Sequence, residues 1–409
     1  MSILFAALLI KGKVTLRDVP AINDVRKVIT LLRSIGVQVD EKGKGEVAVD
    51  ASGEIKIGNL DKRASESLRS SLFLFGALAA REKTYRVYRS GGCHLGERTV
   101  RPHLFALQKL GVSIVTKAGY YQVTNHPLQA ADIVMYESGD TTTENAIMAA
   151  ALAPGTTTIT MASANYQVQD LCYFLVKAGA KIKGIGTTTL VITGVKKLHS
   201  VEEYPIMPDP IVSMTLLSAA ITTHSMLTVT NCPLEFLALE LCKLEVMGQK
   251  FAVTNRRKSK NGHFKVADIT VSPSVLKALP DKIYGRPFPG LNIDNLPLFV
   301  PILTQAKGRT LVHDWAYENR AVYSLDLQKL GARVVLLDAH RLWVEGPTKF
   351  TAGELMCPPA LRPAVNVLIC MLAAKGTSIL RNTQVIDRGY ENLYALLSAA
   401  GAEITIQPD

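Results

Sequence analysis

Residues 107–112 read LQKLGV, and residues 327–332 repeat this stretch as LQKLGA. Four further leucine-containing stretches also close with a glycine, and the six glycines recur at nearly even intervals: Gly36, Gly111, Gly179, Gly248, Gly331 and Gly401. In front of each stretch lies a small, apolar, helix-like run that leads into a short Thr/Val/Ile strand. A chain that repeats one unit six times has its architecture largely decided by that unit.

The third copy shows the predicted unit most clearly. Alternating apolar residues indicate strands, a helical stripe with period 3.6 indicates an amphipathic helix, and Pro154-Gly155 ends the helix before it. Thr141–Thr143 are expected to cap that first helix with their hydroxyl groups. We predict the order strand-helix-strand-helix-strand-strand, over residues 133–136, 144–152, 156–161, 167–177, 181–183 and 189–192.

The two helices of the unit are expected to have different environments. The first is apolar nearly all round and should be buried, whereas the second is amphipathic and should lie nearer the surface. Since a domain averages about 150 residues, six copies suit two α/β (α+β) domains of three units each. The prolines of Tyr204–Pro210 mark the boundary, which gives domains over residues 1–205 and 206–409.

Composition narrows the class of partner. A formal net charge of +11 favours anionic partners, either nucleic acid or phosphorylated small molecules. Nucleic acid is disfavoured because no dense basic run occurs; the nearest, Arg256–Lys260, is interpreted as a solvated hairpin turn. The apolar run Ile3–Ile10 is too short to span a membrane and aligns with the buried helices, so we expect a cytoplasmic protein.

The metal-binding and disulfide classes receive no support from the sequence. The six cysteines form no CxxC pair, and the eight histidines form no HExxH motif. Five of the cysteines lie in apolar contexts and are predicted to be buried small hydrophobes: Cys172, Cys232, Cys242, Cys357 and Cys370.

Single arginines lie at equivalent junctions of the repeat. They begin helices, follow strands or lie in a loop: Arg69, Arg98, Arg320, Arg362 and Arg388. An arginine beside a helix N-terminus makes an anion site, although an arginine taken singly is more often the partner in a surface salt bridge. Together they indicate a shared phosphate or carboxylate pocket.

Cys93 differs from the other cysteines. It lies in Ser90–Arg98 (SGGCHLGER), where His94 and Arg98 flank the thiol. A thiol in an exposed, cationic loop can be activated by a lowered pKa. The alternative is a tight glycine turn that carries an incidental cysteine.

These features resemble the enolpyruvyl transferase family. The sixfold unit, Gly91-Gly92-Cys93, Glu318-Asn319-Arg320 and Asp387–Glu391 (DRGYE) carry the resemblance over essentially the whole chain. It implies two inside-out α/β domains and no metal or organic cofactor. It also implies transfer of an enolpyruvyl group from phosphoenolpyruvate to the 3-hydroxyl of UDP-N-acetylglucosamine with release of phosphate, the first committed step of peptidoglycan precursor synthesis.

The resemblance assigns roles to particular residues. Cys93 matches the general acid at phosphoenolpyruvate, and Asp294 matches the aspartate that binds the acceptor hydroxyl and acts as base. Arg98 matches a contact to phosphate and nucleotide. The remaining arginines match pocket residues for phosphate and carboxylate: Arg69, Arg320, Arg362 and Arg388. Several fixed guanidinium groups suit a reaction between two polyanions.

The sequence also departs from the family pattern. The chain begins at Met1-Ser2, so a Lys-Asn pair and the first strand of the first unit are expected to be missing from it. Ala360, Gly139–Thr143 and Thr99–Arg101 replace a carboxylate and two nucleotide-binding motifs of the family. Two alternatives therefore stay open: transfer to another acceptor, such as a uridine nucleotide, and a non-catalytic paralogue. The shikimate-pathway synthase is disfavoured because it lacks the Gly-Gly-Cys loop, and the sequence predicts no oligomeric state.

Overall fold

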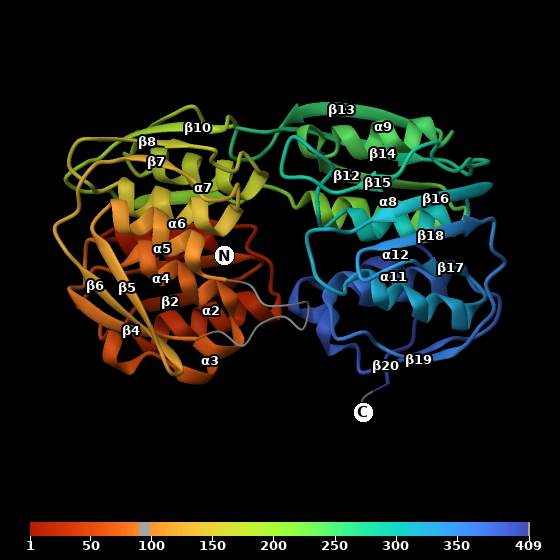
Figure 1. The fold of residues 1–409 in the computed structure, drawn as a ribbon, viewed down its shortest axis with the longest axis horizontal. Coiled ribbons are helices and arrows are strands. Elements are labelled where there is room, and N and C mark those ends of the chain that lie inside the picture. Colours follow the sequence, from red (N-terminus) through yellow and green to blue (C-terminus); the bar gives the residue numbers. More distant parts are fainter. Residues whose placement is uncertain (90–98, 408–409) are drawn as a thin grey trace. The chain divides into compact units, whose positions relative to one another are not determined.

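The computed structural model describes residues 1–89 and 99–407, which divide into two compact units (Figure 1). Met207 ends the first unit and Pro208 begins the second. The boundary expected from the sequence, between residues 205 and 206, falls at the end of the last strand of the first unit.

The first unit contains seven helices, eleven strands and three short 3₁₀ helices among its described residues. Its helices are α1 (Ser2–Ala6), α2 (Asn23–Ser34), α3 (Lys62–Ser67), α4 (Leu74–Ala77), α5 (Arg101–Lys109), α6 (Asp140–Ala150) and α7 (Tyr166–Lys177), with 3₁₀ helices η1 (Ala7–Leu9), η2 (Ile57–Asn59) and η3 (Arg69–Phe73). Its strands are β1 (Lys13–Arg17), β2 (Gln38–Gly43), β3 (Glu46–Asp50), β4 (Thr84–Tyr88), β5 (Val112–Lys117), β6 (Tyr120–Asn125), β7 (Asp132–Val134), β8 (Thr156–Thr160), β9 (Lys181–Lys183), β10 (Thr189–Thr193) and β11 (Val201–Pro205).

The second unit has the same kinds of element. Its helices are α8 (Pro210–Thr222), α9 (Ala238–Val246), α10 (Phe299–Leu303), α11 (Leu361–Leu372) and α12 (Leu393–Ala399), with 3₁₀ helices η4 (Leu234–Phe236), η5 (Leu296–Leu298), η6 (Ala321–Leu330) and η7 (Thr383–Arg388). Its strands are β12 (Leu227–Pro233), β13 (Phe251–Lys258), β14 (Lys265–Val271), β15 (Ile283–Tyr284), β16 (Gly308–His313), β17 (Arg333–Leu336), β18 (Arg341–Gly346), β19 (Glu354–Met356) and β20 (Ile379–Arg381).

Each unit has helices at its centre. In the first unit α1, α4 and α6 pack against one another, and in the second α8, α10 and α11 do the same. Every residue of α1, α4 and α10 is buried, as are nearly all residues of α6, α8 and α11. Helices that are apolar nearly all round are stable only in such a position. The mixed α/β class and the burial of the two helices that begin at Asp140 and Leu361 are thus as predicted from the sequence.

Each copy of the repeat forms its own sheet, and the strands differ between copies. The predicted six-element unit is present in the third copy, whose sheet has the order β7-β8-β10-β9, and in the fifth, with the order β15-β16-β18-β17. In both, the first strand is parallel to the second and the others are antiparallel. Within the described residues the second and fourth copies form three-stranded sheets and the sixth forms the parallel pair β19-β20.

The first copy completes its sheet with a distant strand. β11 lies parallel to β1, with Val14 opposite Val201, in the place that β7 takes beside β8. The first copy starts with α1 in the chain, and β11 takes the edge position in its sheet, so that this sheet also has four strands. Local periodicity does not reveal this pairing, because β11 follows the third copy in the chain.

The repeated glycines have one structural role. All six adopt the left-handed conformation, with φ between 87° at Gly248 and 102° at Gly179. After Gly331, the Ala332 N–H donates to the Leu327 carbonyl oxygen at 3.1 Å, and equivalent bonds follow Gly36, Gly179, Gly248 and Gly401. A left-handed residue that closes a helix in this way is almost always glycine, because it has no Cβ to clash with the backbone.

Replacement of Gly331 by alanine is expected to destabilise the protein by about 1–2 kcal/mol, the cost of a left-handed L-residue. A steric clash with neighbouring residues is not the cause, because a Cβ at this position would lie 3.6 Å from the nearest atom, the Lys349 backbone oxygen. Denaturant unfolding measures the effect. Gly58→Ala is the matched control, since Gly58 has open space and no positive φ. Equal stability of Gly331→Ala and the wild type would contradict the repeat-closure argument.

Two local expectations are wrong. Cys242 is exposed on the surface of α9 and Cys357 is half-buried, whereas Cys172, Cys232 and Cys370 are buried as expected. Thr141–Thr143 lie inside α6 and do not cap it; Gly139 is the N-cap residue and makes no side-chain hydrogen bond there. The helix begins earlier than predicted because Asp140 is held in its first turn.

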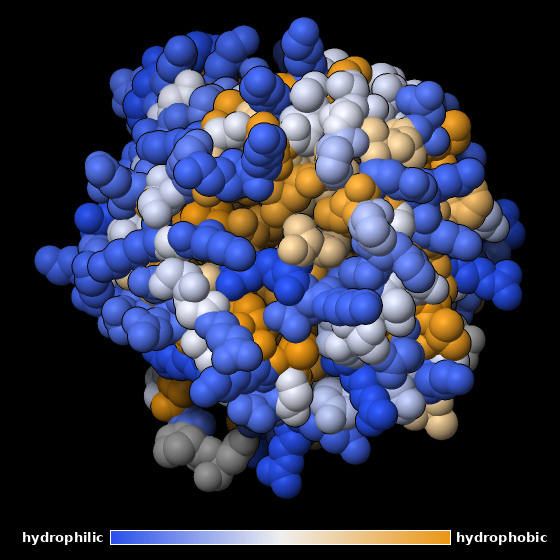
Figure 2. Space-filling model, turned by 90° about the vertical axis from the view of Figure 1, so that its left-hand side faces the viewer, coloured by the Kyte–Doolittle hydropathy of each residue, from blue (hydrophilic) through white to orange (hydrophobic). Residues whose placement is uncertain are grey.

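The surface is mainly hydrophilic on the face shown in Figure 2, with apolar residues exposed in separate areas and gathered most near its centre. Within residues 1–89 and 99–407, no helix has the length and apolar character needed to cross a membrane.

Candidate active site

Asp294 lies in a loop that is held in place by hydrogen bonds to Asn292 and Glu240. Its N–H donates to the Asn292 side-chain oxygen at 2.8 Å, just before η5. Glu240 on α9 accepts from the Asn292 N–H at 3.2 Å and from Asn295 Nδ2 at 2.8 Å. Burial raises the pKa of Glu240, while the Asn295 hydrogen bond opposes this shift. The Asp294 side chain itself is 32% exposed, so its carboxylate is held in place and remains open to solvent.

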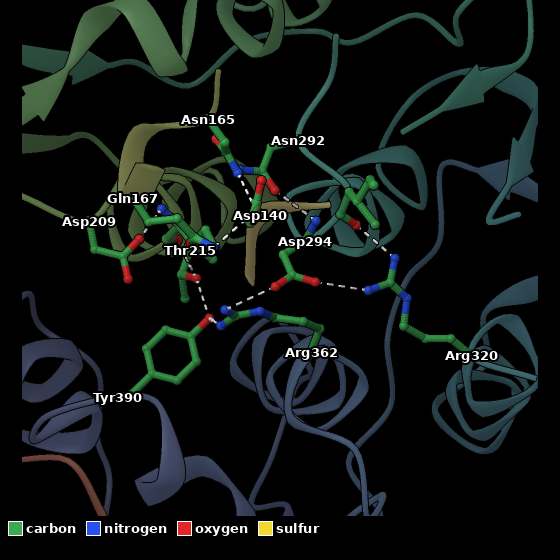
Figure 3. Close-up of polar contacts among 12 residues, drawn as sticks. Asp140, Asn165, Gln167, Asp209, Thr215, Asn292, Asp294, Arg320, Arg362 and Tyr390 are labelled. Atoms are coloured by element: carbon green, nitrogen blue, oxygen red, sulfur yellow. Dashed lines mark hydrogen bonds and ion pairs between the residues drawn. The ribbon is translucent and has the colours of Figure 1, made fainter. Parts of the chain in front are cut away.

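Arg320 binds one oxygen of Asp294. Its Nη1 lies 3.1 Å from Asp294 Oδ1, and its Nη2 donates to the Ile293 carbonyl oxygen at 2.7 Å (Figure 3). The other side of the guanidinium forms a two-pronged contact with Asp314, at 2.6 and 2.9 Å, and the group stacks over the Tyr317 ring. Burial alone would lower the pKa of Arg320, but Asp314 and then Asp294 outweigh it and raise the pKa.

Arg362 faces the other oxygen of the same carboxylate. It lies in the first turn of α11, with Nη2 3.6 Å from Asp294 Oδ2. Its Nη1 donates to the Tyr390 hydroxyl at 2.8 Å, which in turn lies 2.8 Å from the hydroxyl of Thr215 on α8 (Figure 3). Ala360, the N-cap of α11, has no side-chain oxygen to offer the first N–H groups, so Arg362 and the helix dipole both present positive charge here.

This cluster can perform proton transfer beside an anion. A partly exposed carboxylate is a candidate general base, and two fixed guanidinium groups are the usual partners of phosphate and carboxylate groups. Asp314 holds the Arg320 guanidinium and Tyr390 holds that of Arg362. Little reorganisation is therefore needed when charge develops on a substrate beside them.

The structure brings together three of the predicted site residues: Asp294, Arg320 and Arg362. Arg388 ends η7, two positions before Tyr390, and therefore lies on the segment that supplies the tyrosine. Arg69 lies in the first unit, where it begins η3 and donates to the Thr99 carbonyl oxygen at 3.2 Å. Cys93 and Arg98 lie outside the described residues.

Sequence reasoning missed the residues that hold the site. Asp314, Glu240 and Thr215 gave no signal, because each resembles an ordinary loop or helix residue in the sequence. Tyr390 belongs to the DRGYE motif, but nothing in that motif indicates its bond to Arg362.

In the first unit, a neutral histidine accompanies Arg69. His103 on α5 is buried, and its Nδ1 lies 3.0 Å from Asn145 Nδ2 on α6. Burial, and then the charge of Arg69, lowers the pKa of His103 to about 3. The imidazole therefore stays uncharged at neutral pH and adds no positive charge of its own beside Arg69.

Asp140 begins α6 within the segment Gly139–Thr143. Its carboxylate accepts from Ser163 Oγ at 2.5 Å, Asn165 Nδ2 at 2.9 Å and Gln167 Nε2 at 3.0 Å (Figure 3). A negative side chain in the first turn of a helix is stabilised by the helix dipole. An internal anion thus occupies the helix start that the family resemblance assigns to nucleotide binding.

Comparison with known proteins identifies the family. Residues 1–397 match the family described as EPSP synthase (3-phosphoshikimate 1-carboxyvinyltransferase). UDP-N-acetylglucosamine 1-carboxyvinyltransferase 2 of Caldanaerobacter subterraneus subsp. tengcongensis is 34% identical over 404 residues, which cover 99% of this chain and 93% of that protein. UDP-N-acetylglucosamine 1-carboxyvinyltransferase of Bacteroides thetaiotaomicron is 32% identical over 412 residues, 99% of this chain and 94% of that protein.

Solved structures share the fold. The enolpyruvyl transferase NikO from Streptomyces tendae superimposes with a TM-score of 0.83 at 24% identity, over 98% of this chain and 92% of that one. The chain therefore belongs to the EPSP synthase family of enolpyruvyl transferases. The names of the family and of these relatives indicate a carboxyvinyl-transferring enzyme.

Proposed function

We propose that the protein transfers the enolpyruvyl group of phosphoenolpyruvate to the 3-hydroxyl of UDP-N-acetylglucosamine and releases phosphate. The relatives named as carboxyvinyltransferases of this sugar nucleotide, at 31–34% identity, support the choice of acceptor. The single observation that carries the chemistry is the open Asp294 carboxylate, with Arg320 at one oxygen and Arg362 at the other. In this role the enzyme acts in the cytoplasm, at the first committed step of peptidoglycan precursor synthesis.

The proposed reaction has two stages. The acceptor oxygen bonds to C2 of phosphoenolpyruvate while Asp294 takes the hydroxyl proton and Cys93 supplies a proton to C3. Phosphate then leaves C2 with the proton held by Asp294, C3 returns a proton to the Cys93 thiolate, and the double bond is restored in the product. The intermediate between the two stages is tetrahedral at C2, and fixed positive groups that match its geometry lower the barrier.

The arginines hold the charged parts of the substrates in this proposal. Arg362 and Arg388 lie on elements of the second unit that pack against each other, and they bind the phosphate and carboxylate of phosphoenolpyruvate together with Arg98. Arg69 is assigned to the same anions. Arg320 acts differently, because its guanidinium is fixed on Asp314 and orients the Asp294 carboxylate toward the acceptor hydroxyl.

Incubation of the purified enzyme with phosphoenolpyruvate and UDP-N-acetylglucosamine tests the proposal. We expect phosphate release in equal amount to a sugar nucleotide that has gained one enolpyruvyl group, detected by mass spectrometry. Phosphate release without this product would contradict the assigned acceptor. Absence of both, with binding of phosphoenolpyruvate also absent, would contradict the assigned reaction.

A second candidate acceptor is a uridine nucleotide without the sugar. The segment Gly139–Thr143 keeps this candidate open, because it replaces a nucleotide-binding motif of the family and its Asp140 carboxylate is bound internally at the start of α6. Arg101, which begins α5, also stands where the family has an acidic residue. The same assay with uridine monophosphate separates the two: a higher kcat/KM for uridine monophosphate than for UDP-N-acetylglucosamine would select the second candidate.

A further inference from the structure

Arg362 ends a one-directional chain of hydrogen bonds that begins inside the second unit. Thr215 Oγ1 donates its only hydrogen to the Ile211 carbonyl oxygen at 2.8 Å. Its oxygen must therefore accept from the Tyr390 hydroxyl, 2.8 Å away, and the Tyr390 oxygen accepts from Arg362 Nη1 at 2.8 Å. Each hydrogen bond can therefore run in one direction only, and this series of bonds fixes the direction in which the Arg362 guanidinium points.

The inner part of this chain is shielded from water. Tyr390 is 3% exposed and Thr215 is 1% exposed. Burial raises the pKa of the Tyr390 hydroxyl, although Arg362 partly offsets the shift, so the phenol keeps the proton that it donates to Thr215. The Arg362 guanidinium also lies over the Tyr390 ring, 5.3 Å from its centroid. Buried polar groups linked in this way are costly to leave unpaired and specify one arrangement.

The elements that carry the chain are held together without it. Helices α8 and α11 pack against each other directly, and α11 also packs against η7, through side chains of the apolar core. Asp209 separately caps α8 by accepting from the Ile211 N–H at 2.8 Å. The hydroxyl chain is therefore not needed to join the elements; its outer end is the arginine that faces Asp294.

We propose that Tyr390 and Thr215 are positioning residues for Arg362: they hold its guanidinium in the orientation that binds the anionic group of phosphoenolpyruvate beside Asp294. This inference rests on the proposed function of Arg362. Without the hydroxyl chain, the long arginine side chain samples several rotamers, and binding of the substrate has to order it.

Replacement of Tyr390 by phenylalanine keeps the ring and removes only the hydroxyl. The KM for phosphoenolpyruvate is expected to rise about ten-fold, as for loss of one hydrogen bond to a charged group. The KM for the acceptor and the thermal midpoint should remain near their wild-type values. Thr215→Val has the same shape without the hydroxyl group and should raise the KM for phosphoenolpyruvate several-fold. Thr215→Ser keeps the hydroxyl group and should have a KM near the wild-type value.

A double-mutant cycle separates positioning from a structural role. In an Arg362→Ala background, Tyr390→Phe should cause no further loss of phosphoenolpyruvate affinity, measured by titration calorimetry. An equal loss in both backgrounds, or a lowered thermal midpoint with unchanged KM, would overturn the inference. If the wild type turns over and Tyr390→Phe has the same KM for phosphoenolpyruvate, this inference alone is overturned. If the wild type does not bind phosphoenolpyruvate, the proposed function is overturned together with it.

Discussion

Replacement of Asp294 by asparagine is expected to lower kcat about a thousand-fold, within the range that general bases contribute. Asparagine has nearly the same shape and keeps an oxygen for Arg320, so the loop that Asn292 and Glu240 hold should be unchanged. The asparagine amide cannot take the proton from the hydroxyl group of the acceptor substrate. Affinity for phosphoenolpyruvate should be equal or stronger, because the variant removes a negative charge that competes for Arg362.

Steady-state kinetics and calorimetry on the same preparation check this split between kcat and binding. Asp338→Asn is the matched control, because Asp338 also contacts an arginine, Arg341 at 2.7 Å, but on the surface of the same unit. The control should keep wild-type activity. If Asp294→Asn retained more than about a tenth of the wild-type kcat, Asp294 would not be the base.

Replacement of Arg320 by methionine is expected to destabilise the protein by about 3–5 kcal/mol, because it leaves Asp314 buried without its partner. The two side chains are 2% and 6% exposed, with 2.6 Å between Nε and Oδ2. The matched control is Arg309→Met, which breaks an exposed pair with Glu345 at 3.1 Å. Exposed pairs contribute about 0–1 kcal/mol, so denaturant unfolding should separate the two variants clearly.

The double variant Arg320→Met with Asp314→Leu tests the cause. Removing both charges should recover much of the stability, since the unpaired carboxylate is then gone. Activity should stay low, because Asp294 Oδ1 still lacks its guanidinium. Stability that stayed at the single-variant level would show that packing of the arginine, and not the charge of Asp314, explains the loss.

The sequence allowed the repeat and the fold class to be predicted, and it pointed to three residues that the structure brings together in the second unit: Asp294, Arg320 and Arg362. The repeated glycine identifies every copy because a left-handed helix end accepts almost no other residue. Arg362 stood out because an arginine at the start of an apolar helix has no packing role. Such signals are local, and a single sequence contains them directly.

The residues that orient the site were not predictable in this way. Thr215 and Tyr390 are separated by 175 positions and belong to the fourth and sixth copies, so their contact depends on how the inner helices pack. Thr215 within α8 resembles any small core residue. The pairing of β11 with β1 has the same cause, since it joins the end of the first unit to its beginning.

A crystal structure of the enzyme with phosphoenolpyruvate and an acceptor that cannot react, such as a 3-deoxy sugar nucleotide, tests the central claim most directly. The claim is that the Asp294, Arg320 and Arg362 cluster carries enolpyruvyl transfer. We expect the phosphate or carboxylate of phosphoenolpyruvate to contact Arg362, and C3 of the acceptor sugar to lie next to Asp294. Phosphoenolpyruvate bound elsewhere, with Arg362 still turned only toward Asp294 and Tyr390, would contradict it.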